Sequence, residues 1–449
     1  MSRQHPLSSL APRMTLAALK AHSDRHAVAY ALLGFAGGFA IGALFSFDRP
    51  LAALLSLIVD SYGVIAPIVI YLILAPTLLR MLKRTDQGEA TTRVRTILGW
   101  IVSVRAIACL FGIILVSLAY GLAPVGELAA GGLATALEGI VETFRQLMLE
   151  SSYIYAIYAT LLTCFLLRRR EGRVVSIFMS FPDAVERVGE SFTYFTPLFT
   201  FLVGVYVTTL PTVLANELNA SPSGPLMPIE ILGWQIDPTN EGGILAIYLA
   251  VSFLTGAVCT LWHICLLVYA RLQNPWFNVQ SYLRDYFGRI YPLLFATSSE
   301  ALSTPLNLHL LSRWYPQVRA EVRQLTLTLG SIFNINGTLI CCFVMVPATC
   351  MLLGLDVTTT SLLLCLPVIY IIGFGVPGIP GELVLFAGPI MEVLAVPPEA
   401  QAAFLLVFIS IQIGLPDSFR TGANSTDDCL AAIIINKAGK QDPGTNAPG

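Results

Sequence analysis

The residues with the clearest capacity for chemistry lie near the carboxyl end of the chain, in the sequence DSFRTGANSTDD. Asp417, Thr421, Asn424 and Asp428 follow one another at spacings of four, three and four residues, so a helix would carry them along one narrow stripe. Arg420 would lie about 60° to the side of this stripe. Such a set of charged and hydrogen-bonding groups could bind a charged small molecule.

Apolar sequence flanks this polar stripe on both sides. LLVFISIQIGL precedes it and AAIIIN follows it. These flanks predict that the stripe lies at membrane depth, in the middle of an apolar helix. A charge at that depth is unfavourable unless it faces a polar cavity or another charge. The stripe therefore indicates a functional site in a membrane transporter.

The composition of the chain is that of an integral membrane protein. Of its 449 residues 55% are hydrophobic and only 12% are charged, whereas soluble globular chains carry about 25% charged residues. The sequence shows no basic patch for a nucleic acid. Its nine cysteines lie mostly in apolar runs and lack zinc-ligand spacing, so we expect neither a disulfide framework nor a metal–thiolate site. The lipid bilayer is the expected surrounding.

Apolar runs that are long enough to cross a bilayer predict eight spans. They lie near residues 28–46, 51–79, 97–123, 127–167, 191–215, 243–271, 324–355 and 401–436. Clusters of Lys and Arg in alternate connections place both termini in the cytoplasm. Residues 1–27 are expected to be a cytoplasmic tail, because the first apolar run begins too late for an ordinary signal peptide. The expected location is the plasma (inner) membrane.

Two further apolar segments, 290–312 and 357–395, are interrupted by Ser, Pro and Gly near their centres. Basic residues flank the first on both sides and the second on neither, so both ends of each segment face the same side of the membrane. Each segment is therefore predicted to be a re-entrant helical hairpin. Irregular backbone at this depth requires surrounding protein or a water-filled cavity. Two hairpins that enter from opposite faces indicate an inverted repeat with a central site.

Polar groups at membrane depth occur in four stretches. The first hairpin tip reads FATSSEALSTPLN, the next span contains FNINGT, the second tip reads GFGVPGIPGELVLF, and the last span carries the stripe. In this order they resemble the dicarboxylate/amino acid:cation symporter family, the glutamate transporters. That family has a serine-rich first hairpin, an N-M-D-G-T unwound helix, a V-P-G-rich second hairpin and D-x-x-R-T-x-x-N-x-x-x-D in its last helix. The matching ranges are Ser298–Pro305, Asn334–Thr338, Val376–Gly381 and Asp417–Asp428.

The resemblance implies an all-α membrane fold of eight transmembrane helices plus two re-entrant hairpins, assembled as a homotrimer. Residues 28–279 would form a scaffold and trimerisation region, of which spans three and six join the transport domain. Residues 280–437 would form the core transport domain, and residues 438–449 a tail. The resemblance also implies that the transport domain moves across the membrane like an elevator, with the hairpins as gates.

The stripe itself suggests the substrate. Arg420 offers a planar fork for a carboxylate and Asp417 suits an ammonium group. An acidic amino acid such as aspartate or glutamate fits this set, whereas a dicarboxylate without the amine would leave Asp417 buried and unpaired. The resemblance implies the same roles and adds both hairpin tips. The predicted substrate-binding residues are Ser298, Ser299, Glu300, Thr338, Val376, Pro377, Gly378, Asp417, Arg420, Thr421 and Asn424.

A coupling cation, Na+ or H+, is predicted beside the substrate, and no organic cofactor is expected. Asp428, the amide oxygen of Asn424 and carbonyl groups of the unwound helix near Asn334 would make a cage of hard oxygen ligands for Na+. Asn336 completes the set of candidate metal ligands.

Several residues depart from the family pattern. Asn336 replaces the aspartate of N-M-D-G-T, and Arg105 lies in the third span where the resemblance places hydroxyl groups that serve the same cation. Arg105 is therefore a candidate charge substitute for one bound sodium; the alternative is that it snorkels or pairs elsewhere. Glu300 stands where the family has serine, and Glu382 adds a carboxylate at the second tip. Both are candidate proton carriers, and Glu300 could instead neutralise Arg420 and favour neutral amino acids.

Alternatives to this interpretation stay open. Asp417 and Arg420 could merely pair with each other, and the hydroxyl groups of the motifs could cap broken helices. The chain could also be a proton-coupled transporter of dicarboxylates or neutral amino acids, or a channel or sensor relative without coupling. An enzyme is not expected, since no Ser–His, paired-Asp or metal–His pattern appears and His263 stands alone in its span.

Overall fold

The structure, a computed structural model, describes residues 16–45, 87–124, 152–181, 226–374 and 383–436, with shorter stretches between 68 and 83 and between 149 and 209. The first described elements are α1 (Leu16–Leu44), α3 (Gln87–Ala119), α5 (Ser152–Leu167) and α6 (Arg173–Met179). A two-stranded antiparallel ribbon follows, formed by β1 (Ile229–Ile231) and β2 (Trp234–Ile236).

The remaining elements form the carboxyl-terminal half of the chain. They are α9 (Glu241–Gln273), α10 (Val279–Ser281), the π-helical η2 (Tyr282–Phe287), α11 (Gly288–Thr297), α12 (Glu300–Trp314), α13 (Ala320–Phe333), α14 (Asn336–Leu352), α15 (Thr359–Ile372), α16 (Val384–Val393), α17 (Pro398–Gln412) and α18 (Leu415–Ile435).

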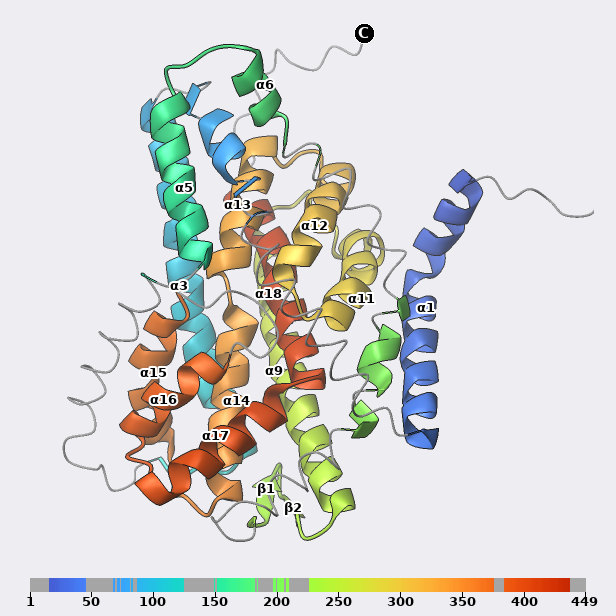
Figure 1. The fold of residues 1–449 in the computed structure, drawn as a ribbon, viewed down its shortest axis with the longest axis vertical. Coiled ribbons are helices and arrows are strands. Elements are labelled where there is room, and N and C mark those ends of the chain that lie inside the picture. Colours follow the sequence, from blue (N-terminus) through green and yellow to red (C-terminus); the bar gives the residue numbers. More distant parts are fainter. Residues whose placement is uncertain are drawn as a thin grey trace, which may run out of the picture.

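Helix α18 lies in the middle of the fold (Figure 1). It packs against α9, α11, α13 and α14, and α3 packs on the far side against α13, α14 and α15. Nearly every side chain of α18 is buried, including its charged ones. Helices from distant parts of the chain therefore enclose the polar stripe.

Helices that are long and apolar enough to span a membrane are present at several of the positions that the sequence predicts. Among the described residues, three segments are long and apolar enough to cross a bilayer: Thr92–Ala119, Gly242–Gln273 and Ala320–Leu352. The pair α17 and α18 would make a fourth if it is counted as one span. The other four predicted runs lie partly or wholly outside the described residues. The total of eight spans stays a prediction.

The last predicted span is bent, which the sequence analysis did not foresee. Helices α17 and α18 are separated by Ile413 and Gly414 and differ in direction by 65°. Gly414 has a φ of 85°, a conformation that favours glycine. Pro416 lies in the first turn of α18, where its missing N–H removes no helical hydrogen bond. The polar stripe thus starts at the beginning of a helix and not in the middle of a continuous apolar one.

Both predicted hairpin segments contain a pair of helices. Ser298 and Ser299 join α11 to α12, and Ser298 adopts the left-handed conformation at a φ of 47°. In the second segment α15 packs against α16, while residues 375–382 of its tip lie outside the described residues. The two pairs lie toward opposite ends of the long axis, with α18 between them (Figure 1). That they enter a membrane from opposite faces is still a prediction.

Tyr248 of α9 holds the bend between α17 and α18. Its hydroxyl donates to the carbonyl of Ile413 at 2.9 Å and accepts from the N–H of Leu415 at 2.8 Å. We expect Tyr248→Phe to destabilise the protein by about 1–3 kcal/mol, because both backbone groups would lose their partner. The measurement is the thermal unfolding transition in detergent. Tyr269→Phe on the same helix, where the side chain is 41% exposed, is the control; equal losses in both variants would contradict this role.

Candidate functional site

Arg420 lies fully buried near the start of α18 and is held from two helices. It forms an ion pair with Asp417, three residues earlier in the same helix. Its Nη1 donates to the hydroxyl of Thr338 at 2.7 Å. Thr338 belongs to the first turn of α14. The guanidinium is therefore placed where α18 meets the break between α13 and α14.

Asn424 connects three elements one turn further along α18. Its amide oxygen accepts from the backbone N–H groups of Gly337 at 2.5 Å and Thr338 at 3.2 Å. Its amide nitrogen donates to the Thr338 hydroxyl at 2.8 Å and to Glu300 Oε1 at 2.7 Å. The first N–H groups of a helix have no partner within it, so Asn424 caps α14 from the side. A Cβ at Gly337 would lie 2.3 Å from the carbonyl oxygen of Arg420, and glycine therefore permits this close approach.

Glu300 brings a second carboxylate to the surroundings of Arg420. It is the first residue of α12, its side chain is buried, and it reaches α18 through Asn424. Among the described residues the group around Arg420 thus contains one guanidinium and two carboxylates, those of Asp417 and Glu300. With all three ionised, the net charge of the group is −1.

The turn of the first helix pair docks on α18 through small polar side chains. The hydroxyls of Ser298 and Ser418 lie 3.3 Å apart, and Ser299 is fully buried beside them. Further along, Asn307 Nδ2 donates to the hydroxyl of Ser425 at 2.6 Å. Thr421 is buried as well. The predicted residues Val376, Pro377, Gly378 and Glu382 lie outside the described residues.

Asp428 lies near the middle of α18, against α13. Its Oδ1 accepts from Asn334 Nδ2 at 2.7 Å. A Cβ at Gly330 would lie 2.0 Å from the same carboxylate oxygen, so only glycine allows Asp428 to approach α13 in this way. The Oδ1 atom of Asn334 is buried without a hydrogen-bond partner in the described part of the protein. Such hard oxygen atoms are the ligands that Na+ prefers.

The structure divides the four predicted metal ligands between three places. Asn334 Nδ2 donates to Asp428, and that the two residues hold a cation stays a prediction. The amide oxygen of Asn424 accepts from the backbone of α14, and the amide nitrogen of Asn336 donates to Asp427 Oδ2 at 3.1 Å. The predicted use of the Asn424 oxygen beside Asp428 thus differs from the contacts observed.

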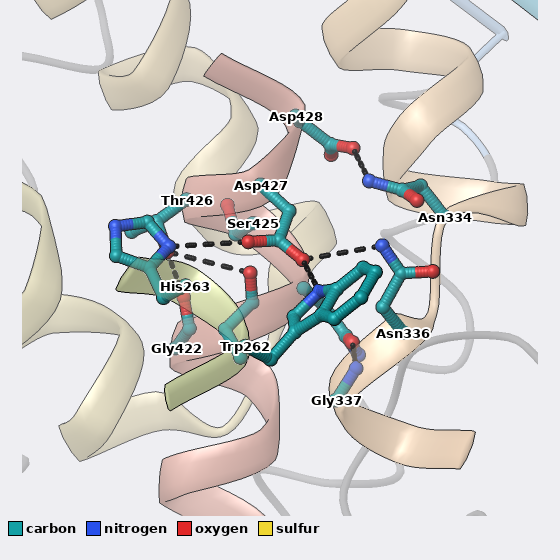
Figure 2. Close-up of polar contacts among 12 residues, drawn as sticks. Trp262, His263, Asn334, Asn336, Gly337, Gly422, Ser425, Thr426, Asp427 and Asp428 are labelled. Atoms are coloured by element: carbon teal, nitrogen blue, oxygen red, sulfur yellow. Dashed lines mark hydrogen bonds and ion pairs between the residues drawn. The ribbon is translucent and has the colours of Figure 1, made fainter. Parts of the chain in front are cut away.

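Asp427 is a buried charged residue that the sequence analysis did not single out. Figure 2 shows its carboxylate between His263 of α9 on one side and Trp262 of α9 and Asn336 on the other. Trp262 Nε1 donates to Oδ2 at 2.7 Å, and His263 Nδ1 lies 3.1 Å from Oδ1. The hydroxyl of Tyr282 lies 3.2 Å from His263 Nε2. A second carboxylate at membrane depth was the available signal, since it requires a partner; its partners on α9, however, lie more than 160 residues away in sequence.

We expect Trp262→Phe to lower stability, because the buried Asp427 carboxylate would lose its shortest hydrogen bond. Hydrogen bonds to charged groups contribute about 1.5–3 kcal/mol. Thermal unfolding in detergent measures the loss. Trp100→Phe is the matched control, since Trp100 stacks on Tyr269 and contacts no carboxylate among the described residues. The same shift in both variants would mean that only ring volume matters.

Gly330→Ala is a second test of the site. The added Cβ would collide with the Asp428 carboxylate, so we expect a clear fall in the unfolding temperature. Gly99→Ala in α3 is the control, because its Cβ would meet nothing within 4 Å and alanine favours a helix over glycine by about 1 kcal/mol. A Gly330→Ala protein as stable as the unmodified one would contradict the close contact described for Asp428.

Comparison with known proteins indicates the class to which these helices and this buried site correspond. Residues 225–438 match the Sodium:dicarboxylate symporter family. The match covers both helix pairs, the break between α13 and α14, and α18. The resemblance predicted from the four motifs is therefore confirmed, since these residues match this family of symporters.

One relative is similar over part of the chain. The serine/threonine transporter SstT of Acinetobacter baylyi is 28% identical to the chain over 146 residues. The aligned part makes up 32% of this chain and 36% of that transporter, so the chain matches about a third of the relative's length.

Proposed function

We propose that the protein is a sodium-coupled symporter of an amino acid. The observation that carries this proposal is the buried ion pair of Arg420 and Asp417 on the same helix as Asp428, between the two helix pairs. A zwitterion offers a carboxylate to the guanidinium and an ammonium to the carboxylate. Entering between the two side chains, it would replace one ion pair by two without changing the net charge of the site.

The charges around Arg420 favour a substrate with a neutral side chain. Arg420 is accompanied by Asp417 and Glu300, so a further carboxylate on the substrate would add to an excess of negative charge. Two like charges about 4 Å apart repel each other by about 4 kcal/mol at an effective dielectric constant near 20. The printed name of the A. baylyi relative, a serine/threonine transporter, agrees with this charge argument. A small hydroxyl-bearing amino acid is therefore the first candidate.

The acidic amino acid predicted from the stripe is the second candidate. It would require Glu300 to carry a proton, which removes one of the two carboxylates and couples transport to protons. Glu300 is 1% exposed, and burial disfavours a charged carboxylate. Aspartate uptake that depends on protons would distinguish this candidate from the first.

The sodium ion is proposed to bind at Asp428. The Asp428 carboxylate accepts from Asn334 Nδ2 between α13 and α18, next to the break that places Thr338 against Arg420. Binding there would connect the occupancy of the ion site to the geometry of the substrate site through the short unwound segment. Movement of residues 280–437 as an elevator within a homotrimer, with the helix pairs as gates, belongs to the same proposal.

Uptake into proteoliposomes tests the proposal. Labelled L-serine and L-aspartate are supplied under an inward sodium gradient at equal pH, or under a proton gradient without sodium. We expect sodium-driven accumulation of serine, with at least a tenfold loss of uptake in Asp417→Asn and a higher sodium requirement in Asp428→Asn. Uptake that does not depend on sodium and is unchanged in both variants would contradict the proposal.

Substitution of Glu300 tests the substrate class. Glu300→Gln keeps the hydrogen bond to Asn424 possible but removes a negative charge, so aspartate should compete with serine about tenfold better, which corresponds to about 1.4 kcal/mol. Glu399→Gln, at an exposed position in the first turn of α17, is the matched control. If aspartate already accumulates in the unmodified protein on a proton gradient alone, the second candidate is correct.

A further inference from the structure

Arg105 of α3 is as deeply buried as Arg420, but among the described residues no carboxylate lies beside it. Both side chains are at most 1% exposed. Arg420 pairs with Asp417, whereas within the described part of the protein Arg105 makes no ion pair. A buried cation at membrane depth requires compensation. The groups that compensate Arg105 therefore indicate what it does.

Arg105 bonds to the carbonyl ends of two helices. Its Nη1 donates to the carbonyl of Phe333, the last residue of α13, at 2.9 Å. Its Nη2 donates to the carbonyl of Tyr370, in the last turn of α15, at 2.8 Å. The last carbonyls of a helix lack partners within it and carry part of the negative end of the helix dipole. The guanidinium thus lies between two partial negative charges.

The usual partners of these carbonyls are engaged elsewhere. The N–H of Gly337, four residues after Phe333, donates to Asn424, and the N–H of Phe374, four residues after Tyr370, donates to the carbonyl of Ile371. Without the guanidinium, both carbonyls would lose the partner that the structure gives them. The arginine therefore satisfies two helix ends at once.

The surroundings of Arg105 are shaped to this side chain. The ring of Phe374 lies 3.8 Å from Cζ, and the ring of Tyr370 lies 5.2 Å from it, so two aromatic faces contact the cation. A Cβ at Gly373 would lie 2.4 Å from Nη2, so glycine makes room for the guanidinium. The hydroxyl of Tyr370 donates to the carbonyl of Val102 at 2.8 Å, which ties α15 to α3 a second time.

We propose that Arg105 is a built-in cation that takes the place of a coupling ion where the carbonyl ends of α13 and α15 converge. Carbonyl oxygens at the ends of broken membrane helices are ligands for Na+, and the guanidinium supplies the same single positive charge to the same kind of oxygen. It does so permanently, so α15, the first arm of the second helix pair, stays attached to α13 without an ion at this place. Each substrate is then accompanied by one ion fewer than in a transporter that binds a coupling ion at this place.

The ion that Arg105 replaces would bind at the end of α15, and Arg105 does not compensate for the missing aspartate at Asn336. The sequence analysis linked Arg105 to the missing aspartate at Asn336, but Asn336 contacts Asp427 and Arg105 contacts backbone carbonyls. The inference rests on the proposed sodium coupling for its meaning in transport. Its test, however, measures the binding of sodium and the protection of α15 from hydrogen exchange, and it requires no transport.

The test compares Arg105→Ala with Arg105→Lys, both combined with Asp428→Asn so that sodium at the proposed site beside Asp428 does not contribute. Unfolding temperature is measured in detergent with NaCl or with choline chloride at equal ionic strength. Without the side chain, the carbonyls of Phe333 and Tyr370 should bind Na+, so Arg105→Ala should unfold at a lower temperature in choline and recover as NaCl rises. Arg105→Lys keeps the charge and should show no sodium dependence.

Equal responses to sodium in the two variants, or no response in Arg105→Ala, would overturn the proposal. If Arg105→Ala does not fold in either salt, Arg105→Gln, which retains one N–H donor, replaces it with the same expectation. Hydrogen exchange of α15 in the Asp428→Asn protein provides a measurement with Arg105 intact. Its protection should be the same in both salts, and a sodium-dependent protection would also overturn the proposal. Failure of serine or aspartate uptake would contradict the proposed function but would leave these results unaffected.

Discussion

The structure depends on one constraint: the charges of α18 must find partners inside the protein. Ions removed from water are costly unless another charge or several hydrogen bonds compensate them. Asp417 pairs with Arg420 on the same helix, Asp428 accepts a hydrogen bond from Asn334 directly after α13, and Asp427 is bonded by α9. These contacts explain why α18 lies among α9, α13 and α14. They also explain the break at Asn334 and Ile335, which frees N–H groups of α14 to bind Asn424.

Much of this arrangement could be predicted because helical geometry is local. The spacing of Asp417, Thr421, Asn424 and Asp428 already placed them on one face, and the positions of Ser, Pro and Gly predicted the interruptions within both helix pairs. The bend at Gly414 was missed because the apolar pattern continues across it, and a single φ of 85° is not encoded in hydropathy. The partners of Asp427 were missed because they are defined only by the packing of α9 against α18.

Asp427 changes the interpretation of the departure at Asn336. The family motif has an aspartate at that position, and its absence suggested that the protein lacks one anion. The structure places the Asp427 carboxylate 3.1 Å from the Asn336 amide, so α18 supplies an anion to the neighbourhood from which α14 has lost one. Trp262 and His263 of α9 bind the same carboxylate and anchor it in the core. Asn336 and the two side chains of α9 thus contact one carboxylate, which α18 supplies.

The two buried arginines differ in what surrounds them, and this difference separates a binding group from a structural one. In the proposed function Arg420 exchanges Asp417 for the substrate carboxylate while the substrate ammonium binds Asp417, so that both side chains keep a partner. Arg105 is balanced by carbonyl dipoles and aromatic faces, which no zwitterion can replace. A substrate with a second carboxylate would add to the negative charge around Arg420 unless Glu300 takes up a proton. In the proposed function the charge on Glu300 therefore selects between neutral and acidic amino acids.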